Sequence, residues 1–138
     1  MKVLVDTSVW SLALRRRAPA HPAVDELRRL IAHGRAALVG PIRQELLSGI
    51  RDRAVFARLR DHLQAFPDEP ITSADYERAA DCCNLCRTKG IQGSNTDFLL
   101  CAVAERHRFP ILTTDDDFVK YGRVLPLRRH AAEAARHP

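Results

Sequence analysis

Four acidic residues stand at points along this chain where a folded sheet would bring them together. In chain order, the first follows the short apolar run 3–5, and the second lies one turn into a helix after another strand. The third opens the helix before the apolar run 110–113, and the fourth follows that run. Because ligands of parallel sheets bind beyond the carboxyl ends of the strands, we expect the acids to converge there. They are Asp6, Glu45, Asp97 and Asp115.

A cluster of carboxylates at one sheet edge favours a bound divalent cation. Like charges a few ångströms apart resist joint ionisation, and a cation removes that cost. A ligand set made only of oxygen atoms suits Mg²⁺ or Mn²⁺ better than zinc. An acidic pocket in an otherwise basic chain is what a metal-dependent enzyme acting on a polyphosphate needs, because the bases neutralise phosphates while the pocket holds cations.

Each acid also has a local structural interpretation. Asp97 fits a capping box with Ser94, and the same pattern recurs at residues 114–117. Glu45 is also what the helix dipole favours early in a helix, and Asp6 alone fits a turn. The functional interpretation therefore rests on the set, in which an acid comes after an apolar strand twice.

Apolar runs and helical periodicities alternate along the chain, which predicts an α/β fold with a mainly parallel sheet. The runs at 3–5, 37–39 and 110–113 predict buried strands. The run 124–127 contains a proline and predicts an edge strand. We expect one domain over residues 1–138. Its expected helices cover 23–33, 41 onward, 52–64, 72 or 73 to 89, and 96–107, with a frayed helix in the tail 128–138.

The composition is that of a globular protein, with 46% hydrophobic and 28% charged residues. The longest apolar run, 98–104, is far shorter than the ~20 residues of a membrane helix, and no cleavage site for a secretory signal follows the N-terminus. We expect a soluble, cytoplasmic protein with no membrane partner. The four cysteines fit small buried hydrophobes in a reducing compartment better than a zinc site.

The charge balance suits an anionic partner such as nucleic acid. Lysine and arginine number 22 against 17 aspartate and glutamate residues, which gives a net charge of +5. Arg15, Arg16 and Arg17 come soon after the turn at Asp6, so they are the best candidates for contacts with RNA phosphates. A run of arginines on a merely solvated surface is the competing interpretation.

Four segments together resemble the PIN-domain nucleases, and most closely the VapC toxins of prokaryotic VapBC toxin–antitoxin pairs. The opening V-D-T-S-V-W and the late T-x-D-x-D-F are the most specific of them, and the resemblance extends from residue 3 to about 127. In chain order the segments are VLVDTSVW at 3–10, ELLSG at 45–49, TDFLLCA at 96–102 and LTTDDDF at 112–118.

This resemblance implies a three-layer α/β/α sandwich with a central, mainly parallel sheet. Asp6, Glu45, Asp97 and Asp115 match the family's catalytic acids, and Asp117 matches a further acid of the last motif. The metal ligands implied are Asp6, Asp97, Asp115 and Asp117, with Mg²⁺ or Mn²⁺ as the cofactor. Thr7 or Thr113 is expected to orient a water through its hydroxyl.

The implied activity is endonucleolytic hydrolysis of RNA, often transfer RNA, by the toxin of a type II toxin–antitoxin pair. Family members commonly form homodimers, and a small VapB-like antitoxin inhibits them by inserting into the active-site groove. Three alternatives stay open: another PIN-type nuclease that processes RNA or acts on DNA, a PIN-like module that binds without cutting, and a haloacid-dehalogenase-like phosphatase. The phosphatase requires an aspartate where Ser8 stands.

Overall fold

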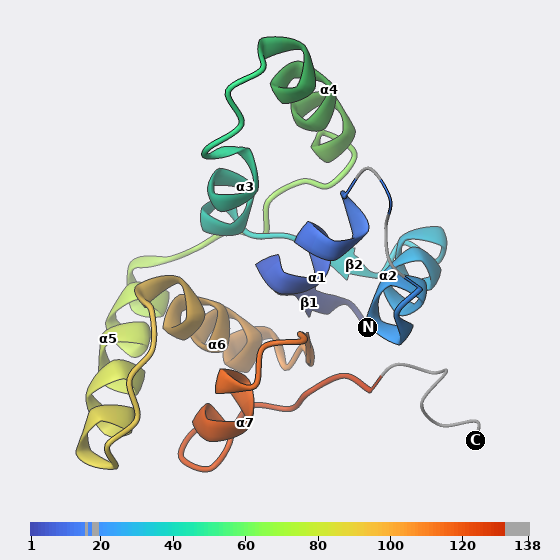
Figure 1. Cartoon of the computed structure of the whole chain (residues 1–138). Coiled ribbons are helices and arrows are strands. Elements are labelled where there is room, and N and C mark those ends of the chain that lie inside the picture. Colours follow the sequence, from blue (N-terminus) through green and yellow to red (C-terminus); the bar gives the residue numbers. More distant parts are fainter. Residues whose placement is uncertain (16, 18–19, 132–138) are drawn as a thin grey trace.

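A three-stranded parallel sheet lies at the centre of the chain. The computed structural model describes residues 1–15, 17 and 20–131 (Figure 1). The sheet order is β2-β1-β3, with β1 Val3–Val5 between β2 Ala36–Ala37 and β3 Ile111–Leu112. All three residues of β1 are completely buried, as expected of a central strand that helices cover on both faces.

The helices form groups around this sheet. In Figure 1 the sheet lies between the α1–α2 pair and the group made by α5, α6 and α7, while α3 and α4 extend away together. This arrangement confirms the α/β fold with a parallel sheet. The helices are α1 Thr7–Ala13, α2 Pro22–Ala32, α3 Gly40–Leu47, α4 Arg53–Leu63, α5 Ser73–Thr88, α6 Asn95–His107 and α7 Asp117–Tyr121.

The sequence explains where the longer helices begin. The Asp52 carboxylate accepts hydrogen bonds from the backbone of Ala54 and Val55 at the start of α4. Thr72 and Asp75 form a complete capping box at the start of α5. Residues 98–104 of α6 are all buried, because this helix packs against α5 and lies inside the molecule.

The C-terminal part departs from the prediction. Residues 124–127 do not form a strand, because Val124 and Leu125 donate their N–H groups back to Tyr121 in a turn after α7. The edge pairing falls later in the sequence, where the backbone of Ile111 bonds to Arg128 and His130. Residues 128–131 are therefore extended rather than helical, and residues 132–138 of the predicted tail helix lie outside the described part.

An ion pair between a buried carboxylate and a partly exposed arginine ties the start of α5 to the end of α6. Asp75 is 2% exposed, and its carboxylate accepts hydrogen bonds from the Arg106 guanidinium at 2.8 Å on both oxygens. The backbone N–H of Thr72 also donates to Asp75, at 2.9 Å. The Arg106 hydrogen bonds lower the pKa of Asp75 although burial opposes this.

Within the described residues, no helix is long and apolar enough to cross a membrane.

We predict that Arg106→Ala lowers the free energy of unfolding by clearly more than Arg78→Ala does, because it leaves the buried Asp75 carboxylate without its cation. Urea unfolding of the purified chain at pH 7 measures this. The difference in unfolding free energy between the native chain and Arg106→Ala narrows below about pH 4. There Asp75 is protonated in the unfolded chain, so folding no longer gains the full benefit of the ion pair.

Arg78→Ala is the matched control. Arg78 pairs with the more exposed carboxylates of Asp81 and Glu105, so its loss costs less than about 1 kcal/mol. Equal costs for the two variants would contradict a special role for the Asp75 pair.

Candidate active site

Three aspartates from different segments meet at the carboxyl edge of the sheet. Asp97 lies in the first turn of α6, Asp115 follows β3, and Asp117 begins α7. One carboxylate oxygen from each lies within 4.8 Å of the other two. We call these three residues the aspartate cluster. Hard oxygen atoms at such spacing are the donors that Mg²⁺ and Mn²⁺ prefer, so the residues present fit a divalent ion.

Asp6 is held beside the cluster by two hydroxyl groups. Its backbone N–H donates to Leu112 of β3, which carries the strand pairing up to the site. Its Oδ2 accepts hydrogen bonds from Ser8 and from Thr113, both at 2.8 Å, and the residue is 5% exposed. Thr113 Oγ1 also accepts the backbone N–H of Asp115 at 3.0 Å. One hydroxyl thus links the acids that follow two neighbouring strands.

The triple aspartate divides into two partly buried residues, Asp115 and Asp117, and one exposed residue, Asp116. The Asp115 carboxylate accepts the backbone N–H of Asp117 at 2.9 Å, a local turn that precedes α7. Asp116 lies between them, is exposed and stands outside the aspartate cluster. Lys120 reaches Asp117 at 3.8 Å, and both of these side chains are largely exposed to solvent. The structure thus separates two candidate ligands from the middle residue.

The carboxylate of Asp97 combines a capping position with a place in the cluster. Ser94 Oγ accepts the backbone N–H of Asp97 at 3.1 Å, so the capping interpretation is correct for Ser94. The Asp97 carboxylate meanwhile accepts the Tyr121 hydroxyl at 2.6 Å. Burial, together with the negative charges of Asp6 and Asp115, raises the pKa of Asp97 despite that hydrogen bond. The ionised cluster is electrostatically costly when no cation is bound.

Glu45 lies next to the cluster rather than in it. It projects from α3 and accepts the Thr7 hydroxyl at 2.9 Å, which connects it to the first residue of α1. Both residues line a hollow of about 520 Å³ that also borders Thr96, the neighbour of Asp97. Asp6 and Glu45 are both absent from the group of three whose oxygens approach within 4.8 Å among the described residues.

Two hydroxyl-bearing residues of the site, Ser8 and Tyr121, are assigned no role from the sequence, although Ser8 lies within the V-D-T-S-V-W segment. Ser8 donates to Asp6 and accepts the backbone N–H of Thr114 at 3.1 Å. Tyr121 comes from α7, a helix that the apolar pattern does not predict. The predicted hydroxyl residues Thr7 and Thr113 are both present, and each donates its proton to a carboxylate. Each of these hydrogen bonds fixes the orientation of a carboxylate, and the predicted role in orienting a water stays a prediction.

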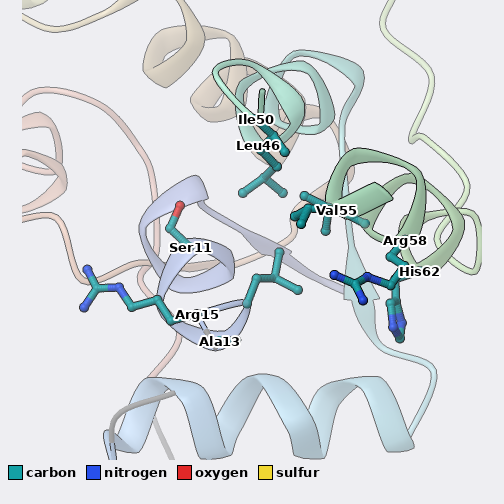
Figure 2. A pocket seen from close by; sticks show the side chains of 10 residues that line it. Ser11, Ala13, Arg15, Leu46, Ile50, Val55, Arg58 and His62 are labelled. Atoms are coloured by element: carbon teal, nitrogen blue, oxygen red, sulfur yellow. The ribbon is translucent and has the colours of Figure 1, made fainter. Parts of the chain in front are cut away.

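A larger groove lies between α1, α3 and α4 (Figure 2). Its volume is about 960 Å³, and in Figure 2 the side chains of Leu46 and Val55 point into it. Arg15 lines one end and is exposed, as is Arg17, whereas Arg16 lies outside the described residues. We call this the α1–α3–α4 groove; it is lined by Ser11, Ala13, Leu14, Arg15, Leu46, Ile50, Val55, Arg58, Leu59 and His62.

The chain is similar in sequence to known ribonucleases. Residues 3–124 match the PIN domain family. A VapC ribonuclease of Mycobacterium bovis and ribonuclease VapC11 of Mycobacterium tuberculosis are each 32% identical to it over 130 residues. These alignments cover 91% of this chain and 96% of each relative.

Solved structures share the fold at lower sequence identity. The crystal structure of FitAcB from Neisseria gonorrhoeae aligns with a TM-score of 0.75 and 20% identity, over 94% of this chain and 97% of that chain. VapBC2 from Rickettsia felis, bound to a DNA fragment from its promoter, aligns with a TM-score of 0.76 and 16% identity, over 94% and 98%. At such identities these likenesses establish the fold alone.

We predict that Mn²⁺ at saturating concentration raises the melting temperature of the native chain by about 5 °C or more, because bound ligand stabilises the folded state. Asp97→Asn abolishes this rise. The same variant melts higher than the native chain when both are free of metal at pH 7. The pKa of the partly buried Asp97 carboxylate is raised, so its ionised form opposes folding above that pKa.

The control is Asp61→Asn, which keeps the full response to Mn²⁺. Asp61 is an exposed aspartate of α4, and its carboxylate lies 3.5 Å from the Arg60 guanidinium. An Mn²⁺ response that survives in Asp97→Asn would place the ion elsewhere.

Proposed function

This chain belongs to the PIN domain family, and from that premise we propose that it is a metal-dependent endoribonuclease that acts as the toxin of a type II toxin–antitoxin pair. The observation that carries the proposal is the aspartate cluster at the carboxyl edge of a parallel sheet, with Asp6 and Glu45 beside it. Relatives named as VapC ribonucleases support RNA as the substrate. The proposed substrate implies the cytoplasm as the compartment.

Asp97, Asp115 and Asp117 would hold the divalent ion, either Mg²⁺ or Mn²⁺, with Asp6 completing the acidic surround. A divalent ion in such a site lowers the pKa of a water and offsets negative charge that develops on the phosphate. The chain's own residues supply placement. Ser8 and Thr113 fix the Asp6 carboxylate by its Oδ2, while Thr113 also fixes the loop of Asp115 through that residue's backbone.

Glu45 has a different assignment from the cluster. Its carboxylate is oriented by Thr7 and faces the hollow shared with Thr96, at the side of the cluster formed by α6. We assign it the acceptor of a proton from water or from the substrate on that side. The exposed Arg15 and Arg17 supply positive charge for the RNA backbone, in agreement with the net charge of +5.

A module that binds RNA without cutting fits these observations less well. The pKa of Asp97 is raised by burial and by neighbouring acids, so keeping the cluster ionised opposes folding. A protein that only binds RNA gains nothing from this arrangement. Destabilising charge that is retained at one point is typical of an active site.

The α1–α3–α4 groove is the surface we assign to the antitoxin. Its walls are mostly apolar, with Arg58 and His62 on α4 as polar lining residues. It reaches the helices that carry Thr7 and Glu45, so a segment bound there lies beside the active site. Similar folds come from structures named as toxin–antitoxin complexes, including one from Klebsiella pneumoniae. The proposal includes a homodimer, as family membership implies.

We predict that the purified chain cuts total cellular RNA into discrete fragments with Mg²⁺ or Mn²⁺, and that EDTA stops the cutting. Asp6→Asn and Asp115→Asn each lower the cleavage rate by about 100-fold or more, because both remove charge from the metal site. Gel analysis followed by sequencing of fragment ends measures the rate and identifies the target.

Asp116→Asn is the matched control, since Asp116 is exposed and lies outside the cluster. It keeps its rate to within about twofold, as surface changes usually do. Cutting that persists in EDTA and in both site variants would reveal a contaminating nuclease and contradict the proposal.

We also predict that Val55→Glu weakens capture of the proposed cognate antitoxin by about tenfold or more, since binding would bury the new charge in the groove. Val55 is 39% exposed on α4, so the variant still folds and still cuts RNA. Co-purification of the tagged chain with that antitoxin is the measurement. If Val55→Glu captures the antitoxin as well as the native chain does, the antitoxin binds at another surface and the assignment of this groove is wrong.

A further inference from the structure

A fully buried tyrosine reaches the aspartate cluster from α7. Tyr121 has no solvent exposure, and its hydroxyl donates a hydrogen bond of 2.6 Å to Asp97 Oδ2. The contact joins residues that are 24 positions apart and belong to different helices. Neither the sequence motifs nor the proposed function assigns a role to this side chain.

The surroundings of the ring fix where the hydroxyl points. Phe98 and Phe118 each lie with ring centroids 5.1 Å from the Tyr121 ring, in tilted and edge-on arrangements. The backbone of Gly93 covers the ring at close range. A Cβ at position 93 would lie 2.3 Å from the Tyr121 hydroxyl oxygen and 2.7 Å from the ring carbon that bears it. The position of the Tyr121 ring and hydroxyl therefore requires glycine at position 93.

We propose that Tyr121 is a positioning residue for the metal centre, which holds the Asp97 carboxylate in the orientation that binds a divalent ion. The inference rests on the proposed function insofar as the aspartate cluster binds metal. Tyr121 acts through Asp97, as the outer partners of metal ligands generally do. Its hydroxyl donates a hydrogen bond to one carboxylate oxygen, which keeps the carboxylate from rotating about the Cβ–Cγ bond of Asp97.

A neutral donor suits this place better than a cation would. The neighbouring Asp6 and Asp115 charges already act on Asp97, and a lysine or arginine there would compensate the charge that attracts the metal ion. A phenol orients the carboxylate and leaves its charge available. The Asp6 carboxylate is likewise oriented by neutral donors, the hydroxyls of Ser8 and Thr113.

The test is Mn²⁺ binding to the full chain without RNA, measured by titration calorimetry on the native protein and on Tyr121→Phe. The phenylalanine keeps the ring between Phe98 and Phe118 and removes only the hydroxyl. We expect about tenfold weaker Mn²⁺ binding. Tyr76→Phe makes the same chemical change at the chain's other tyrosine, which is 57% exposed on α5, and leaves Mn²⁺ affinity unchanged.

A second variant leaves the tyrosine in place and moves it. In Gly93→Ala the new methyl group displaces the hydroxyl from Asp97, so we expect Mn²⁺ affinity to fall by about the same factor as in Tyr121→Phe. The midpoint of Mn²⁺ activation of RNA cleavage rises correspondingly in both variants, and the rate at saturating Mn²⁺ returns toward the native rate.

The outcomes separate this inference from the proposed function. If native and Tyr121→Phe chains bind Mn²⁺ equally well and share one activation midpoint, Tyr121 serves only in packing and the inference is wrong. If the native chain binds Mn²⁺ but cuts no RNA, the nuclease proposal fails while the affinity comparison still decides the role of Tyr121. If the native chain binds no Mn²⁺, both fail together.

Discussion

Mutual repulsion among carboxylates is the constraint that shapes this molecule. Asp97 lies near Asp6 and Asp115 in a partly buried site, and those charges raise its pKa together with burial. The chain holds the acids with neutral donors, since the hydroxyls of Ser8, Thr113 and Tyr121 each donate to one of them. Orientation is thereby achieved without cancelling charge, which leaves the attraction for a divalent cation intact.

The parallel sheet makes this gathering feasible. Because β1 and β3 run side by side in the same direction, the acids that follow them leave the sheet at the same edge. The hydrogen bond from the Asp6 backbone to Leu112 extends that pairing up to the site. The stability that the repelling acids cost is supplied elsewhere, by the buried interior of the sheet and α6 and by pairs such as Asp75 with Arg106.

The sequence alone predicts most of the framework but only part of the site. Buried strands leave a continuous apolar signal, so β1 and β3 are predicted correctly, together with the position of an acid directly after β1 and soon after β3. The edge pairing is misplaced because Arg128 and His130 make it through backbone groups, which any residue carries. The contact between Tyr121 and Asp97 could not be predicted for another reason. It depends on a short helix, α7, and on the absence of a side chain at Gly93. Contacts between distant segments leave no local pattern.

Crystals soaked in Mn²⁺ would test the central claim most directly, through the anomalous scattering of the ion. We predict one dominant anomalous peak between the carboxylates of Asp97, Asp115 and Asp117, at coordination distance from an oxygen atom of each. The Tyr121 hydroxyl should remain on Asp97 in that structure. A peak at another surface, or none at the aspartate cluster under saturating Mn²⁺, would contradict the account.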